Sequence, residues 1–257
     1  MVKLATPISH FFDDKSRGEK IVAESSCLEC REKSLESTVP NQYLFHLDTD
    51  INRPWGSAEK EFLSSIIRNK KDLKLITFHM STSCTEPILR EEVYYCEGKT
   101  LSRREMLDNI KENMEWFRSQ IKGREIKIGV ENNNYYPTGA YEDVTDADFL
   151  QQSVHGNNIY FVFDIAHAKI TAFNKKISLD EYMKELPFDR LIQVHVSKEG
   201  FNDKGWAMDA HELPDSGMYE EVKNLLHYHS PEYLTIEYYK DYDKLIELLK
   251  KYHNLCV

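Results

Sequence analysis

The chain has 257 residues, a length that (β/α)8 barrels often occupy as one domain. Hydrophobic residues make up 41% and charged residues 30%, which is typical of a globular protein and argues against a disordered chain. The net charge of −10 argues against a large nucleic-acid-binding surface, because phosphate binding relies on clustered Lys and Arg. The sequence has neither an apolar run of membrane-spanning length nor a secretory signal, so we expect a cytoplasmic protein.

The five cysteines are an odd number in a chain without a recognisable secretory signal. That combination indicates a reducing compartment and predicts no disulfide framework among Cys27, Cys30, Cys84, Cys96 and Cys256. Cys27 and Cys30 form a CxxC pair, but no second pair accompanies it. We therefore expect both to belong to one strand rather than to a zinc or redox site.

In chain order, short apolar runs alternate with amphipathic stretches, which is the pattern of βα units around a parallel sheet. This pattern predicts eight strands, at residues 2–8, 26–31, 42–47, 73–79, 126–131, 159–164, 191–196 and 233–237. Capping boxes at Ser102 with Glu105 and at Ser178 with Glu181 predict the starts of two of the intervening helices.

Eight strands with interleaved helices predict an α/β fold, a (β/α)8 TIM barrel, with residues 1–257 as a single domain. An open doubly wound sheet is the alternative. No glycine-rich phosphate loop follows the first predicted strand to support it.

Acidic and imidazole side chains stand at the ends of the third to the eighth predicted strands, and barrel enzymes place their catalytic groups there. So many such groups in one apolar mouth would repel one another or be desolvated unless cations held them together. Imidazole and carboxylate ligands without thiolate suit Zn, Fe or Mn. We therefore predict a metal centre whose ligands are His46, His79, Glu131, Asp164, His167, His195, Asp209, His211 and Glu237.

Two features after these strand ends have other interpretations. The polar loop 132–141 offers amides and phenols over the mouth, and it is either a substrate-binding loop or a turn-rich surface loop. Ser81 and Cys84 follow His79, but no base stands at a readable spacing, so we do not expect a nucleophile there.

The order of these residues resembles a known arrangement. Glu131-Asn132, Asp164-x-x-His167, His195, Asp209-x-His211 and Glu237 resemble the metal ligands of the xylose-isomerase-like superfamily of barrels. With His46 and His79 added, the set is similar to the trinuclear zinc arrangement of apurinic endonucleases of the endonuclease IV type.

The connecting sequence is similar to a nearer relative, the DUF692 family of multinuclear non-haem iron-dependent oxidases. The similar segments are 178–182, 186–195, 209–214 and 234–237, within a region from about residue 101 to residue 249. This resemblance implies an iron cluster that uses dioxygen to modify Cys or other residues of a ribosomally made peptide. It also implies a separate peptide-recognition protein as partner.

The chain departs from that family at two places. The family usually has Asp-Val-Asn-Asn at the sixth strand, where this chain has Asp164-Ile-Ala-His167, which resembles the endonuclease and isomerase branches. The stretch 46–55 lacks the family's small-residue loop that ends in glycine.

Three enzyme hypotheses follow, all with two or three divalent metal ions, of which Fe is preferred and Zn or Mn are alternatives. The first is an O2-using iron oxidase that acts on a peptide or a small thiol-containing molecule. The second is a zinc-dependent phosphodiester hydrolase. The third is a sugar isomerase or epimerase in which Glu131 or Glu237 moves a proton as a catalytic residue. Duplex DNA is not expected as substrate, because Arg53 and Lys198 are the only obvious cations beside the ligands.

Overall fold

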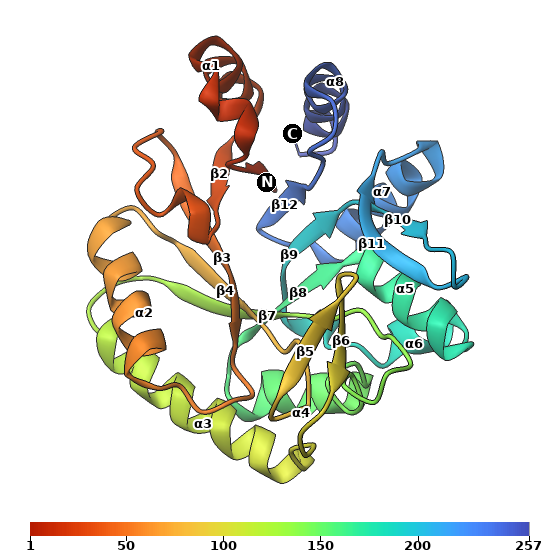
Figure 1. The fold of residues 1–257 in the computed structure, drawn as a ribbon. Coiled ribbons are helices and arrows are strands. Elements are labelled where there is room, and N and C mark those ends of the chain that lie inside the picture. The colour runs from red at the N-terminus through yellow and green to blue at the C-terminus, as the bar shows by residue number, and fades with distance from the viewer. Residues whose placement is uncertain (257) are drawn as a thin grey trace.

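The computed structural model describes residues 1–256, and its centre is a closed barrel of eight parallel strands in the order β1-β12-β9-β8-β7-β4-β3-β2 (Figure 1). These strands are β1 Lys3–Pro7, β2 Cys27–Cys30, β3 Gln42–Asp50, β4 Leu75–His79, β7 Lys127–Glu131, β8 Tyr160–Asp164, β9 Leu191–Val196 and β12 Tyr233–Ile236. Each predicted strand coincides with one of them, and only β3 extends more than two residues beyond its predicted end. The predicted TIM barrel is therefore confirmed.

Helices surround the barrel, as Figure 1 shows. They are α1 Lys15–Glu24, α2 Ser57–Asn69, α3 Arg103–Gln120, α4 Ala147–Gly156, α5 Ile165–Lys175, α6 Leu179–Lys184, α7 Ser216–His229 and α8 Tyr242–His253, with short 3-10 helices at His10–Asp13, Glu32–Ser34 and Phe188–Arg190. Both predicted capping boxes start helices: Ser102 accepts a hydrogen bond from the Glu105 amide before α3, and Ser178 accepts one from the Glu181 amide before α6. None of the helices within residues 1–256 is both long and apolar enough to cross a membrane.

The register of the parallel strands brings the predicted ligands to one level at the carboxyl end of the barrel. Asp164 on β8 is directly opposite His195 on β9, and His195 is directly opposite Thr235 on β12. Side chains alternate between the two faces of a strand. The buried side chains of Asp164 and His195 lie on the face that points into the barrel interior.

Cys27 and Cys30 confirm the strand interpretation of the CxxC pair. Both lie in β2, are at most 1% exposed and are free thiols. Burial raises the pKa of Cys27 to about 12 and that of Cys30 to about 11, so both remain unreactive thiols at neutral pH.

Two antiparallel hairpins were not predicted. One consists of β5 Pro87–Arg90 and β6 Val93–Cys96, and the other of β10 Lys198–Phe201 and β11 Ala207–Glu212. Both follow the carboxyl ends of barrel strands, β4 and β9, and therefore extend over the mouth. The second hairpin includes Asp209 and His211, which lie outside the eight predicted strands.

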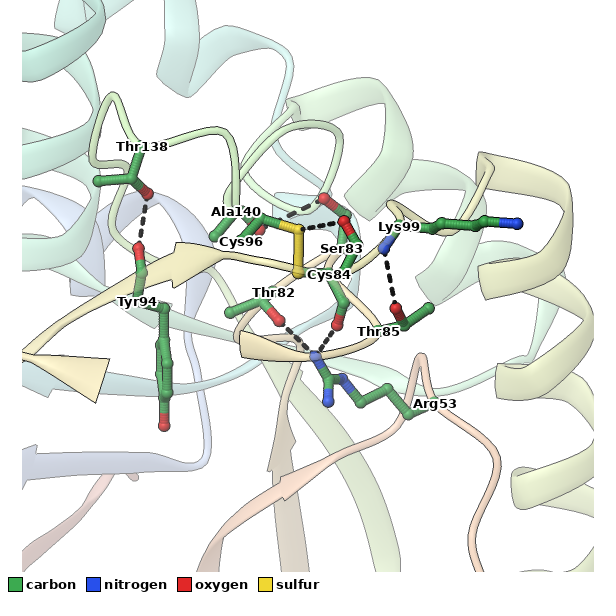
Figure 2. The surroundings of a disulfide bond; sticks show 11 residues. Arg53, Thr82, Ser83, Cys84, Thr85, Tyr94, Cys96, Lys99, Thr138 and Ala140 are labelled. Carbon is green, nitrogen blue, oxygen red and sulfur yellow. Dashed lines mark hydrogen bonds between the residues drawn. A yellow bond between two sulfur atoms is a disulfide. The ribbon is translucent and has the colours of Figure 1, made fainter. Parts of the chain in front are cut away.

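A disulfide joins Cys84 to Cys96, with the two Cα atoms 5.5 Å apart (Figure 2). The prediction of no disulfide is wrong for this pair, because the hairpin folds the chain back and brings together two cysteines 12 residues apart. Because this disulfide is present, the cysteine count no longer indicates a reducing compartment. The bond ties the end of β6 to the segment after β4, where Arg53 donates hydrogen bonds to Thr82 and to the Cys84 carbonyl.

Candidate metal centre

All nine predicted ligands converge at the carboxyl end of the barrel. They come from β3, β4, β7, β8, β9, the first turn of α5, β11 and the residue after β12. Seven of them line a cavity of about 310 Å³, namely His46, His79, Glu131, His167, Asp209, His211 and Glu237. The other two, Asp164 and His195, are 1% and 0% exposed. The structure thus brings together every residue that the sequence analysis assigned to the site.

Glu131, at the end of β7, is the hub of the cluster. Its Oε2 atom lies 3.6 Å from His46 Nε2, 3.5 Å from His79 Nε2 and 3.6 Å from His167 Nδ1. Its Oε1 atom lies 2.6 Å from Nδ1 of His195. Burial raises the pKa of this carboxyl, but His195 and His167 outweigh that effect and lower it. Glu131 is therefore an ionised carboxylate whose two oxygens face different groups of imidazoles, the geometry of a bridging ligand.

His46 and His79 form the first group of donors. Their Nε2 atoms are 2.6 Å apart, and the Nδ1 atom of His46 lies 2.7 Å from the Thr77 hydroxyl. Contact with Thr77 on one side leaves Nε2 of His46 to face His79 and Glu131. The pKa of His46 lies well below its ordinary value, because burial disfavours the imidazolium and nearby Arg31 and His79 add repulsion. His46 is thus a neutral imidazole, the form that binds metals.

Asp164, His167 and Asp209 form the second group. One Asp164 oxygen accepts a hydrogen bond of 2.7 Å from the His167 amide and so caps α5, while burial raises the pKa of this carboxyl to about 7. His167 has Nδ1 2.9 Å from the Asn132 carbonyl oxygen and Nε2 3.3 Å from Asp209 Oδ2. The carbonyl can only accept, so Nδ1 carries a proton, and Nε2 is the nitrogen that a metal ion would bind after displacing its proton.

His195, Glu237 and His211 form the third group. Glu237 Oε1 lies 3.3 Å from Nδ1 of His195, and Oε2 lies 3.2 Å from Nε2 of His211. His211 also has Nδ1 3.5 Å from Asp209 Oδ1, which links the third group to the second. Its backbone has a φ of 45°, a left-handed conformation that costs a non-glycine residue on the order of 1 kcal/mol or more and that is common where a side chain is held for function.

Glu29, in the middle of β2, is a member of the centre that the sequence analysis missed. It is 0% exposed, and its Oε2 atom lies 3.2 Å from Nε2 of His195 and accepts a hydrogen bond of 2.6 Å from Gln193. This contact fixes the His195 ring so that Nδ1 faces Glu131. A carboxylate inside the apolar run from Cys27 to Cys30 is the sequence signal that could have identified it.

Arg31 corrects the prediction that Arg53 and Lys198 are the cations beside the ligands. Its Nη2 atom lies 2.7 Å from Glu29 Oε1 and also contacts Glu237 Oε1, whose pKa it helps to lower well below the usual range against the effect of burial. Arg53 instead pairs with Asp50 at 3.4 Å. Lys198 pairs with Asp215 at 2.7 Å. Arg31 follows the second strand, at which no ligand had been expected.

The donor set fits divalent metal ions. Within residues 1–256, Glu131 Oε1, His195 Nδ1 and Asp209 Oδ1 are buried without a hydrogen-bond partner, although His195 Nδ1 and Glu131 Oε1 are only 2.6 Å apart. A nitrogen and an oxygen atom this close face a common point, where one cation could bind to both. Three groups have all their donor atoms within 4.8 Å of one another: His46, Glu131 and His195; Glu29, His195 and Glu237; and Glu131, Asp164 and His167. Several ions can therefore be held, by nitrogen and oxygen donors.

Residues 100–255 match the family model described as RiPP precursor modification enzyme MbnB/TglH/ChrH. The chain belongs to this family. The match covers more than half of the chain and contains seven of the nine predicted ligands, all except His46 and His79. It confirms the resemblance to the DUF692 family, and it shows that this MbnB/TglH/ChrH family member is a metalloenzyme of a peptide-modifying kind.

Solved structures of xylose-isomerase-like barrels share the fold of this MbnB/TglH/ChrH family member. A D-tagatose 3-epimerase-like protein is 18% identical with a TM-score of 0.65, and the alignment covers 99% of this chain and 98% of that one. The 3-keto-D-glucoside 4-epimerase YcjR from E. coli is 11% identical, with a TM-score of 0.60 and 99% of both chains covered. The IOLI protein, solved with a bound zinc atom, is 12% identical with a TM-score of 0.60, covering 99% of this chain and 96% of that one. No curated protein matches the sequence. At these identities the structures establish the fold alone.

Proposed function

We propose that this family member is an iron-dependent oxidase that uses dioxygen to modify a thiol of a short peptide. The observation that carries the proposal is the position of Glu131, whose two carboxylate oxygens face separate sets of imidazoles beside an open cavity. Such a bridging carboxylate suits two or more ions close together. Membership of a family of peptide-modifying enzymes supports the peptide as substrate.

The ligands in this proposal are the nine predicted residues. His46, His79 and Glu131 would hold one ion, and Asp164, His167, His195, Asp209, His211 and Glu237 would supply the ligands for the others. Iron in this place would supply a site at which dioxygen and a substrate thiolate meet, and its charge would lower the pKa of the thiol. The chain's own contribution is to orient the imidazoles, through Thr77, Glu29 and the Asn132 carbonyl, and to shield the cluster from bulk water.

The cavity favours a small reacting group over a duplex. It has a volume of about 310 Å³, which suits one or two side chains of a peptide, and its lining includes Tyr94 of β6 and the amides of Asn133 and Asn134. In this proposal, loop 132–141 binds the substrate and is not merely a turn-rich surface loop. A separate protein that presents the peptide is the partner that we propose.

Anaerobic purification followed by metal analysis tests the proposal. We expect at least two iron ions per chain, an absorption spectrum that changes when O2 is admitted, and O2 uptake that depends on an added Cys-containing peptide. Two results together would contradict the oxidase and favour the hydrolase. The purified protein would be colourless and contain zinc, and the protein reconstituted with iron would not react with O2.

One observation favours a sugar epimerase as second candidate. Glu131 and Glu237 both line the cavity, and both approach Nδ1 of the buried His195, at 2.6 Å and 3.3 Å, so two carboxylates lie close together at its wall. Two such groups can remove and return a proton at a carbon whose neighbouring oxygen is polarised. Incubation of the Mn-loaded protein with D-tagatose in D2O would reveal this activity as deuterium incorporated at carbon, detected by NMR. If the protein exchanges no carbon-bound proton, the epimerase is excluded for that sugar.

A further inference from the structure

Arg31 projects a guanidinium into the metal centre from the end of β2. Among the described residues it is the only Lys or Arg that lines the 310 Å³ cavity. Its backbone is fixed, since its amide donates to the Ser34 hydroxyl at 2.8 Å and its carbonyl accepts from that hydroxyl at 2.9 Å. The side chain is 24% exposed, so it is held among the ligands and still reaches the cavity.

The guanidinium has more hydrogen-bond donors than its protein partners use. Nη2 contacts Glu29 and Glu237. Nε is buried without a partner within residues 1–256, and no hydrogen bond from Nη1 is found in that part of the chain. An arginine carries five N–H donors, and with Nη2 taken by the two carboxylates and Nε buried, the N–H groups of Nη1 remain for an acceptor that is not part of the protein. An anionic oxygen, as in a carboxylate, is the acceptor that such a charged donor binds most strongly.

The charge of the centre decides when an anion can approach. The carboxylates of Glu29, Glu131, Asp164, Asp209 and Glu237, set against one guanidinium, leave about four negative charges when all are ionised. Two divalent ions cancel that charge and a third makes the centre positive. With two or more divalent ions bound and the ligating histidines neutral, an anionic substrate is therefore not repelled by the centre.

We propose that Arg31 binds a carboxylate of the substrate and so sets which thiol reaches the metal ions. The carboxylate is either the C-terminus of a peptide or an acidic side chain next to the reacting residue, because both present the same planar anion. The proposal deepens the peptide-oxidase function and rests on it for the identity of the thiol. Arg31 would thus determine substrate specificity, beyond its contacts with Glu29 and Glu237.

The test compares cysteine with cysteamine, which has the same thiol and amine but no carboxylate. Affinities for protein reconstituted anaerobically with Co(II) are measured by calorimetry, and the thiolate–Co(II) absorption band is recorded in parallel. In the wild-type protein we expect cysteine to bind on the order of tenfold more tightly, as for a charge-assisted hydrogen bond. Arg31→Gln should remove the difference, and Arg31→Lys should keep part of it, because lysine retains the positive charge with fewer N–H donors.

The possible outcomes distinguish carboxylate binding by Arg31 from binding by other residues of the site. If cysteine and cysteamine bind equally to the wild-type protein, or if Arg31→Gln keeps the preference or weakens both ligands equally, Arg31 does not bind the carboxylate. Should Arg31→Gln fail to take up Co(II), the comparison of Arg31→Lys with wild type decides the same question. A cysteine preference without a thiolate–Co(II) band would support Arg31 and contradict the thiol chemistry of the proposed function.

Matched dipeptides then identify the source of the carboxylate. A preference for Gly-Cys over its C-terminal amide indicates a peptide C-terminus. A preference for Asp-Cys amide over Asn-Cys amide indicates an acidic side chain. In either case Arg31→Gln should abolish the preference, and a preference that survives the substitution would overturn the assignment to Arg31.

Discussion

His46 and His79, from adjacent strands β3 and β4, point their Nε2 atoms at each other across 2.6 Å, and both face one oxygen of Glu131 at 3.6 Å and 3.5 Å. The two nitrogens belong to rings inclined at 68°, so they converge on a point instead of stacking. Three donors that converge in this way are a preorganised place for one ion.

Replacing Glu131 by Gln should remove most of the bound metal, because an amide supplies neither the charge nor the second ligating oxygen. We expect less than about a tenth of the wild-type metal content by elemental analysis, with unchanged far-UV circular dichroism, since the barrel core does not depend on this side chain. Glu112→Gln, on the exposed face of α3, is the matched control and should bind metal normally. A Glu131→Gln protein with full metal content would refute the bridging role.

Replacing Glu29 by Gln should weaken metal binding by about ten- to a hundredfold, the usual effect of removing the partner that orients a ligating histidine. The amide can still accept from His195, but it adds N–H donors where the Gln193 amide already donates, so the ring loses its fixed orientation. Competition with a chromophoric chelator measures the affinity. Wild-type affinity together with an unchanged Co(II) spectrum would show that Glu29 has no positioning role.

His167→Ala should lower the metal stoichiometry by one ion and leave the remainder bound. His167 contacts Asp209 at 3.3 Å, whereas His46 and His79 contact each other and Glu131, and the substitution leaves those contacts in place. Elemental analysis after gel filtration gives the stoichiometry. If the variant retains every ion and the same metal spectrum, His167 is a packing residue of α5 and not a ligand.

Metal binding should stabilise the fold. An ion at a free concentration of a hundred times its Kd contributes about 2.7 kcal/mol, which corresponds to a rise in Tm of roughly 5–10 °C for a chain of this size. Thermal unfolding with chelator and with added Fe(II) under anaerobic conditions measures the shift. The same chelator should leave the Tm of Glu131→Gln unchanged, and an equal shift in both proteins would point to binding elsewhere.

The contribution of Asp164 to the stability of the metal-free protein should fall as the pH rises from about 4 to about 7. Its pKa is raised from its usual value to about 7 by burial, so over this range the folded state keeps a proton that the unfolded chain has released. His46, whose pKa is lowered by burial, acts in the opposite direction below about pH 6.5, so the effect of Asp164 is seen by comparison with a variant.

Urea unfolding of chelated protein at pH 5 and pH 7 checks this sign. Asp164→Asn keeps a side-chain oxygen for the His167 amide but cannot titrate, so between pH 5 and pH 7 the wild type should lose stability relative to this variant. Because metal must displace the protons of Asp164 and His167, metal affinity should rise with pH. A wild-type protein that gains stability relative to Asp164→Asn over this range would contradict the assignment.

The barrel was predictable because its signals are local and repeated. Residues 191–196 were predicted as a strand and are β9 Leu191–Val196, since a buried parallel strand is a short apolar run. The ligands followed from the rule that strand ends meet at one rim. The two hairpins were missed because β5 and β6 have only four residues each, and their pairing depends on a turn and a disulfide rather than on apolar periodicity.

Glu29 and Arg31 could not be placed from the sequence for a different reason. They belong to the second strand, which carries no histidine, and Glu29 lies before the strand end at which ligands were sought. Whether a charged residue on β2 faces the centre depends on the stagger between strands around the closed barrel. That stagger is set by all eight strands together, so no single segment of the sequence reveals it.

Asp209 and His211 differ from the other predicted ligands in the element to which they belong. They belong to β11, which pairs only with β10 in a two-stranded sheet, and their side chains are 23% and 30% exposed. A hairpin of this kind opens locally at a lower free energy than a closed barrel does. An ion held by these two residues would therefore exchange with solvent on a shorter timescale than one held by His46 and His79. We accordingly expect a purified sample to have mixed occupancies, with the ion at Asp209 and His211 the first to be lost during handling.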